Sequence, residues 1–206
     1  MMLGGLLWVL TYVVEIIIGV TAGEAAYNRA DPSASLLEWL WPAFFMGAIF
    51  FLGIGLLGVW AQLQGHAKLL GFLGALLACV AIVAVSINLV ILTGISGEPT
   101  ASDDLGFLGV IGTLGGSVLL GIATLRAKVL PRWARFALTL LPLAFIPAII
   151  ATIPLASVAP EYVIADLPFP VVGAVLATVG YAVLSSREDA EETMKNRPLA
   201  AEPVGE

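Results

Sequence analysis

Six long apolar runs constrain this chain more than any other feature of its sequence. They cover residues 3–20, 40–63, 69–95, 105–125, 136–158 and 169–184. A helix needs about 20 apolar residues to cross a bilayer, whereas a membrane strand needs about ten with alternating polarity. No run alternates in that way. The sequence therefore predicts an all-α, polytopic membrane bundle of six transmembrane helices over residues 1–184, and a short, partly disordered cytoplasmic tail over residues 185–206.

The composition supports a membrane location. Hydrophobic residues make up 60% of the 206 residues and charged residues only 12%, against about 25% charged in soluble domains. Lipid accepts this apolar excess on every side of a helix. Membrane lipids are therefore the expected partners, and nucleic acid is not. Whether a second copy or another membrane protein also binds stays open.

The distribution of basic residues predicts the orientation. With six spans, one side of the membrane receives eight of the nine basic residues: Lys68, Arg126, Lys128, Arg132, Arg135, Arg187, Lys195 and Arg197. Basic short loops stay cytoplasmic, so both termini are expected in the cytoplasm and the protein in the plasma membrane. Trp8, Trp60 and Trp133 are expected at the inner headgroup level, and Trp39 and Trp41 at the outer one.

The first span also invites comparison with a cleaved secretion signal, because small residues follow it. A signal peptide carries a basic start and a shorter apolar region. Residues 1–5 hold no lysine or arginine, and Glu15 interrupts the apolar run. We therefore expect the first span to be retained, while cleavage would leave five spans.

Glu15 is the only acidic residue inside an apolar run. A carboxylate at a helix centre costs about 2.5 to 3.5 kcal/mol on insertion scales, so such residues usually face the bundle interior. Thr11 shares its helical face, and Asn88 and Thr152 are expected at a similar depth in the third and fifth spans. These four residues define a candidate polar layer if their helices are neighbours.

Two interpretations of this layer stay open. In the first, Glu15 exchanges a proton or binds a cationic group in a cavity that opens outward. In the second, Glu15 is protonated or hydrogen-bonded to Asn88 and ties two helices together, an effect averaging about 0.6 kcal/mol per interhelical bond. Pro142 and Pro147 should bend or break the fifth helix. Broken helices line the substrate sites of many transporters, but proline is also common in ordinary membrane helices, and curvature without transport is the favoured explanation.

Small residues predict how the helices pack. In the fourth span they recur every four residues, in one row at Gly109, Thr113, Ser117 and Gly121 and in a second at Gly112 and Gly116. Such spacing lets helix backbones approach closely. A compact bundle centred on the fourth helix follows.

The sequence lacks the residues that a disulfide, a zinc site or a catalytic centre would require. Cys79 and His66 are the only cysteine and histidine, so a single chain offers neither a disulfide nor a His/Cys zinc site. No metal or cofactor is expected. An enzyme would need a nucleophile with a base, or paired carboxylates, and the spans offer neither.

The inner connection near residue 130 concentrates positive charge. Its candidate contacts with anionic lipid are Arg126, Lys128, Arg132, Trp133 and Arg135. The stretch from Gly121 to Ala134 resembles the helix, basic loop, LPRW and helix junction of small uncharacterised bacterial membrane proteins with about six spans. That resemblance implies a bacterial inner membrane, but no activity.

Two function classes follow from these observations. The first is a non-catalytic membrane component that packs with lipid or partner proteins. The second is a small secondary transporter or proton-linked carrier that uses Glu15, Asn88 and a kinked fifth helix.

Overall fold

A computed structural model describes residues 1–27, 36–63, 67–92, 102–152, 154–155, 160–164 and 166–195. Every regular element in these ranges is helical. The elements are α1 (Met2–Tyr27), α2 (Leu36–Gln62), α3 (Lys68–Leu92), α4 (Ser102–Ala127), α5 (Arg132–Thr152), α6 (Glu161–Ile164) and α7 (Pro168–Lys195).

Six of these helices are long and apolar enough to cross a membrane. Their candidate spans are Met2–Thr21, Leu40–Gln62, Lys68–Ile91, Asp104–Ala127, Arg132–Thr152 and Pro168–Ser185. The predicted all-α bundle of six membrane helices is therefore confirmed, and the chain is built as a multi-pass membrane protein. α7 continues past its span to Lys195, as a helical extension of the tail.

α5 differs from the expected helix in two respects. It remains one helix through Pro142 and Pro147, so of the predicted bend or break, the break is absent. Neighbouring helices and local adjustments in a membrane bundle satisfy the groups that proline frees. α5 ends at Thr152, whereas the sequence predicted helix to residue 158; residues 153 and 156–159 of that range lie outside the described residues.

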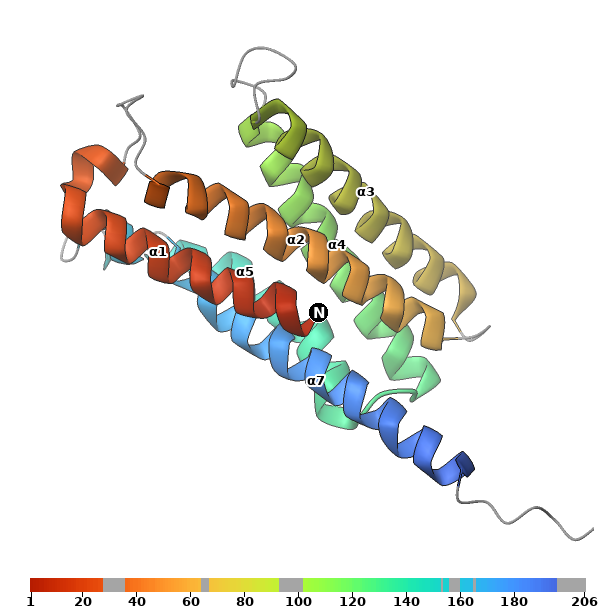
Figure 1. Ribbon diagram of the computed structural model, residues 1–206. Helices are drawn as coiled ribbons and strands as arrows, with labels where there is room; N and C mark the ends of the chain where they lie inside the picture. Colours follow the sequence, from red (N-terminus) through yellow and green to blue (C-terminus); the bar gives the residue numbers. More distant parts are fainter. Residues whose placement is uncertain are drawn as a thin grey trace, which may run out of the picture.

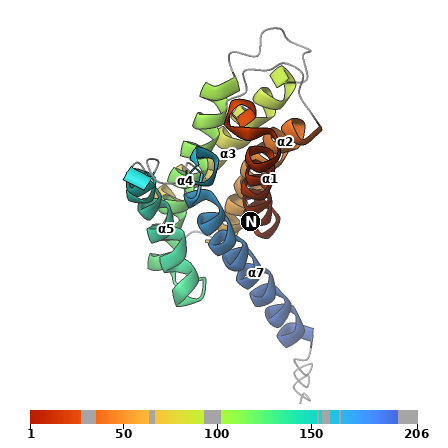
Figure 2. The same ribbon diagram turned by 90° about the vertical axis from the view of Figure 1, so that its left-hand side faces the viewer.

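The six long helices form a ring in chain order. α1 packs against α2, α2 against α3, α3 against α4 and α4 against α5; α5 meets α7, which returns to α1. α2 also contacts α4 across the ring. Figures 1 and 2 show this arrangement from two directions, with α5 and α7 spreading apart toward the C-terminal end of α7.

Glycines set the closest approaches in the ring. A Cβ added at Gly116 of α4 would lie 3.0 Å from the backbone oxygen of Gly74 in α3. One added at Gly173 of α7 would lie 2.6 Å from the backbone oxygen of Gly5 in α1. Only residues without side chains allow helix backbones this close, so the small residues of α4 pack as the sequence predicts.

The two ends of the bundle differ in charge. We call the end with the α2–α3 and α4–α5 connections the basic end, because Lys68, Arg126 and Lys128 lie there, exposed. The opposite end, with Asp104 and Asp166, is the acidic end. The predicted topology requires the basic residues to gather at one end of the bundle in this way.

α1 is displaced toward the acidic end relative to its neighbours. The Met1 ammonium lies 3.4 Å from the backbone oxygen of Phe51, in the middle of α2. Gly4 packs against Ala48 and Leu52, and Figure 1 shows the N-terminus halfway along the bundle. α1 therefore begins level with the middle of α2 and reaches beyond the start of α7.

The displacement changes the place of Trp8. Trp8 was expected at the inner headgroup level, but its side chain is 0% exposed and packs against Phe169 at the acidic end of α7. That expectation was wrong, because a helix that begins level with the middle of α2 carries its eighth residue toward the acidic end. Trp60 and Trp133 are exposed at the basic end, as expected for headgroup-level tryptophans.

Candidate functional site

Glu15 is deeply buried near the acidic end. Its side chain is 2% exposed, and Thr11, one turn earlier, is also buried and donates its hydroxyl to the Leu7 oxygen at 2.9 Å. The Tyr12 hydroxyl donates to the backbone oxygen of Val163 in α6 at 2.7 Å. Both Glu15 and Asp166 lie close enough to that hydroxyl to interact with it electrostatically. Glu15 thus belongs to the junction of α1 with α6.

Asn88 is 1% exposed and lies where α3 meets α4 and α2. A Cβ added at Gly106 of α4 would meet Asn88 Nδ2 at 3.5 Å and the Phe45 ring at 3.8 Å, so Asn88 is level with Phe45.

Thr152 is buried at the C-terminal end of α5 and donates its hydroxyl to the Ile149 oxygen at 2.6 Å. Within the described ranges, α1 packs against α2, α6 and α7, α3 against α2 and α4, and α5 against α4 and α7. The helices of Glu15, Asn88 and Thr152 thus share neighbours. A single layer joining the three residues stays a prediction.

An aromatic cluster, which sequence reasoning missed, fills the centre of the ring toward the acidic end. Phe169 of α7 makes edge contacts with Trp8 of α1, Phe45 of α2 and Phe145 of α5, at ring-centroid distances of 5.5, 6.0 and 4.9 Å. Trp41 stacks on Phe45 at 5.3 Å. The four helices contribute these rings from distant parts of the chain, so no local pattern could have grouped them.

The connection between α4 and α5, which we call the basic turn (residues 126–135), is held by backbone geometry. Lys128 adopts a left-handed conformation (φ 57°), and its amide donates to the Thr124 oxygen at 2.8 Å. Leu130 is 4% exposed and anchors the turn in the core. α5 then begins at Arg132, directly after Pro131, so the chain reverses direction within four residues.

The side chains of the basic turn point into the surroundings. Arg126, Lys128 and Arg132 are exposed, Trp133 is 50% exposed, and Arg135 is half-buried. The Arg132 guanidinium lies 5.9 Å from the centre of the Phe136 ring. Among the described residues, no carboxylate forms an ion pair with these four cations. Their charge is therefore available to anions.

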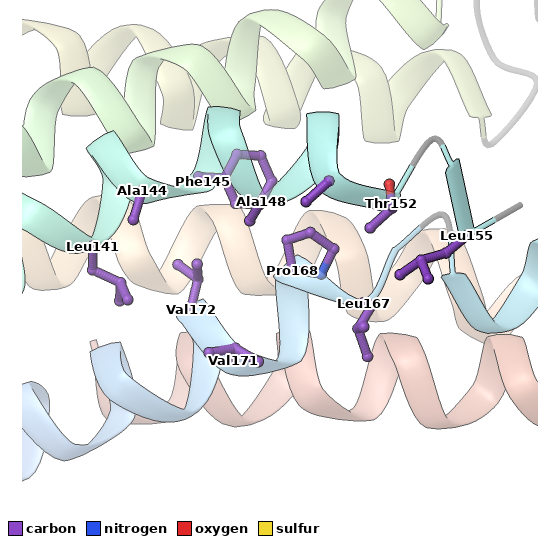
Figure 3. A pocket seen from close by; sticks show the side chains of 11 residues that line it. Leu141, Ala144, Phe145, Ala148, Thr152, Leu155, Leu167, Pro168, Val171 and Val172 are labelled. Carbon is purple, nitrogen blue, oxygen red and sulfur yellow. The ribbon is translucent and has the colours of Figure 1, made fainter.

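An apolar groove of about 290 Å³ lies between α5 and α7 at the acidic half of the bundle. Figure 3 shows the side chains that line it. They are Leu141, Ala144, Phe145, Ala148, Ala151, Thr152, Leu155, Leu167, Pro168, Val171 and Val172. On α5 the floor of the groove is formed by Ala144, Ala148 and Ala151. Their side chains are small, and Val171 and Val172 on α7 do not fill the space that remains.

Metal-binding side chains do not gather in the parts of the chain described above: no three His, Cys, Asp or Glu residues lie close enough there to hold an ion. Cys79 is exposed on the lipid-facing side of α3 and not packed within the bundle. His66 lies outside the described residues.

No family model, curated protein or solved structure matches this chain.

Proposed function

We propose that this protein is a non-catalytic membrane component that acts through contacts with lipids, and that its basic turn binds anionic headgroups. The observation that carries the proposal is the exposure of Arg126, Lys128 and Arg132 at one end of the bundle, with no described carboxylate to neutralise them. Each basic residue near an anionic surface contributes about 1 kcal/mol. Trp133 beside them supplies the amphipathic ring that favours the headgroup level.

The orientation and membrane belong to the same proposal. The basic end faces the cytoplasm of a bacterial-type plasma membrane. Both termini are directed to that side: the tail extends from it, and the N-terminus of α1 points toward it from halfway along the bundle. The first span is retained in the mature protein. Its packing supports this, because α1 covers both α2 and α7 through Gly4 and Gly5, and cleavage would uncover both helices.

The test measures binding of phosphatidylglycerol, with phosphatidylcholine as the neutral reference, to protein purified in a non-ionic detergent. Native mass spectrometry counts bound lipids while phosphatidylglycerol is titrated. Arg126→Gln and Lys128→Gln should each weaken phosphatidylglycerol binding about fivefold, which corresponds to about 1 kcal/mol. Raising the salt concentration should weaken it further.

Lys68→Gln is the matched control, because Lys68 is exposed at the same end of the bundle but outside the basic turn. It should leave most of the binding intact. Equal losses for Lys68→Gln and Arg126→Gln, or equal binding of the two lipids, would contradict a headgroup site at the basic turn.

A carrier using Glu15 is the second candidate, favoured by the burial of a carboxyl group in a membrane helix. Two observations count against it. Glu15 is almost fully covered, and the aromatic cluster around Phe169 fills the ring between α1, α2, α5 and α7. A substrate passing between these four helices would have to separate the aromatic side chains of the cluster.

A further inference from the structure

The basic turn contains a backbone conformation that its residue disfavours. Lys128 directly follows the last residue of α4, and its φ of 57° lies in the left-handed region. A residue with a Cβ is strained there, whereas glycine is not, and glycine is the residue that most often ends a helix in this way. The chain reversal after α4 therefore uses a conformation that a lysine adopts only at a cost in stability.

The surrounding structure holds Lys128 in this conformation from both sides. Its amide donates to the Thr124 oxygen at 2.8 Å, which satisfies a carbonyl group at the end of α4. Thr124 is 0% exposed, and Leu130 on the other side is 4% exposed. A strained backbone persists where its neighbours are fixed in this manner, and such strain is found at functional sites.

The side chain of Lys128 adds a second cost. It is exposed, and it follows Arg126 by two residues and precedes Arg132 by four, both of which are exposed as well. Like charges that lie close together repel one another. Glycine at position 128 would remove the strain and reduce the repulsion, so the turn itself gives no reason for a lysine. The charge of Lys128 is the property that glycine would lack.

We propose that Lys128 occupies this left-handed position for its charge, and that an anionic lipid headgroup bound at the basic turn offsets the cost. The inference rests on the headgroup site proposed above and names Lys128 as the residue through which that lipid stabilises the fold. A ligand that binds the native state raises its stability. The stability of the bundle therefore depends on the anionic lipid content of the membrane.

The first experiment compares Lys128→Gly with Lys128→Ala in the full chain, purified in a non-ionic detergent with phosphatidylcholine alone. Both changes remove the charge, but only glycine also relieves the left-handed strain. Lys128→Gly should unfold about 2 to 4 °C above Lys128→Ala, and also above the wild type, when unfolding is followed by circular dichroism. Equal unfolding temperatures of Lys128→Gly and the wild type would overturn the proposal, because no cost would remain for a lipid to offset.

Arg126→Gly is the matched control, because Arg126 lies in the last turn of α4 and is exposed. The same replacement of a cation by glycine lowers the helix propensity there, so Arg126→Gly should unfold about 2 °C below the wild type. Opposite signs at two positions so close together separate the backbone effect from the loss of a positive charge. An equal rise for both variants would overturn the assignment of strain to Lys128.

The second experiment adds phosphatidylglycerol to the same proteins. At saturation it should raise the unfolding temperature of the wild type by about 2 to 4 °C more than that of Lys128→Gly, because fivefold weaker binding reduces the stabilisation that a ligand provides. The advantage of the glycine variant should therefore shrink or vanish. An equal rise in the two proteins would overturn the role of Lys128 but keep a headgroup site, whereas no rise in either would contradict the headgroup site itself.

Lys128→Asn gives a second variant in case Lys128→Gly does not fold. Asparagine tolerates the left-handed region better than other residues with a Cβ and also ends helices. Lys128→Asn should therefore unfold above Lys128→Ala in phosphatidylcholine and gain less than the wild type from phosphatidylglycerol. The opposite result in either comparison would overturn the proposal.

Discussion

At the scale of single residues, Glu15 carries the choice between the two functional candidates. Its carboxyl group is covered by protein, and its neighbourhood contains the Tyr12 hydroxyl that bonds to Val163. A structural role requires the shape and hydrogen bonding of the side chain but not its charge. A carrier requires the charge to change during its cycle.

We predict that Glu15→Gln has the same thermal unfolding curve as the wild type at every pH between about 5 and 9, a range that covers carboxyl groups shifted by burial. Glu15→Ala should be less stable by about 1 to 3 kcal/mol, because it deprives buried polar neighbours of their partner. Unfolding is followed in detergent by circular dichroism. A pH-dependent step in the wild type that Glu15→Gln lacks would instead favour the carrier.

At the scale of helices, backbone contact between α1 and α7 fixes the depth of α1. Gly5 and Gly173 face each other with almost no space for a side chain. Trp8 lies beside the same contact, since a Cβ added at Gly173 would be 2.9 Å from the Trp8 Cβ. The position of the aromatic cluster therefore depends on two glycines at opposite ends of the chain.

Gly173→Ala should lower the stability by about 1 to 3 kcal/mol, the usual cost of overpacking a filled interior. The control is Gly58→Ala in α2, where an added Cβ would meet no atom within 4 Å. Both changes give the helix the same gain in propensity, so the difference between their unfolding temperatures isolates the clash. Equal temperatures would show that the two helices are not held this closely.

At the scale of the whole molecule, the asymmetry between the basic and acidic ends predicts one orientation in the membrane. Single cysteines placed at Lys68 and at Asp104, in a Cys79→Ser background, test it. A membrane-impermeant thiol reagent added to intact cells should label the cysteine at position 104 and spare that at position 68. Reversed labelling would place the basic end outside, against the proposed topology.

The sequence by itself determined the number of helices long enough to span a membrane, their approximate bounds and their apolar character. These properties are local, because span length and apolarity are set within about 20 consecutive residues. The small residues of α4 were informative for the same reason: their spacing along one helix already defines a face. The exposed cations of the basic turn also follow from their adjacency in the chain.

Only the tertiary structure decided the depth of α1, and with it the places of Trp8 and Glu15. Depth depends on which residues of α1 meet α2 and α7, and Gly4 and Gly5 select partners far away in the sequence. The aromatic cluster and the α5–α7 groove arise in the same way, between helices and not within them. Apolar runs define membrane helices one at a time, but packing between backbones sets how they are aligned.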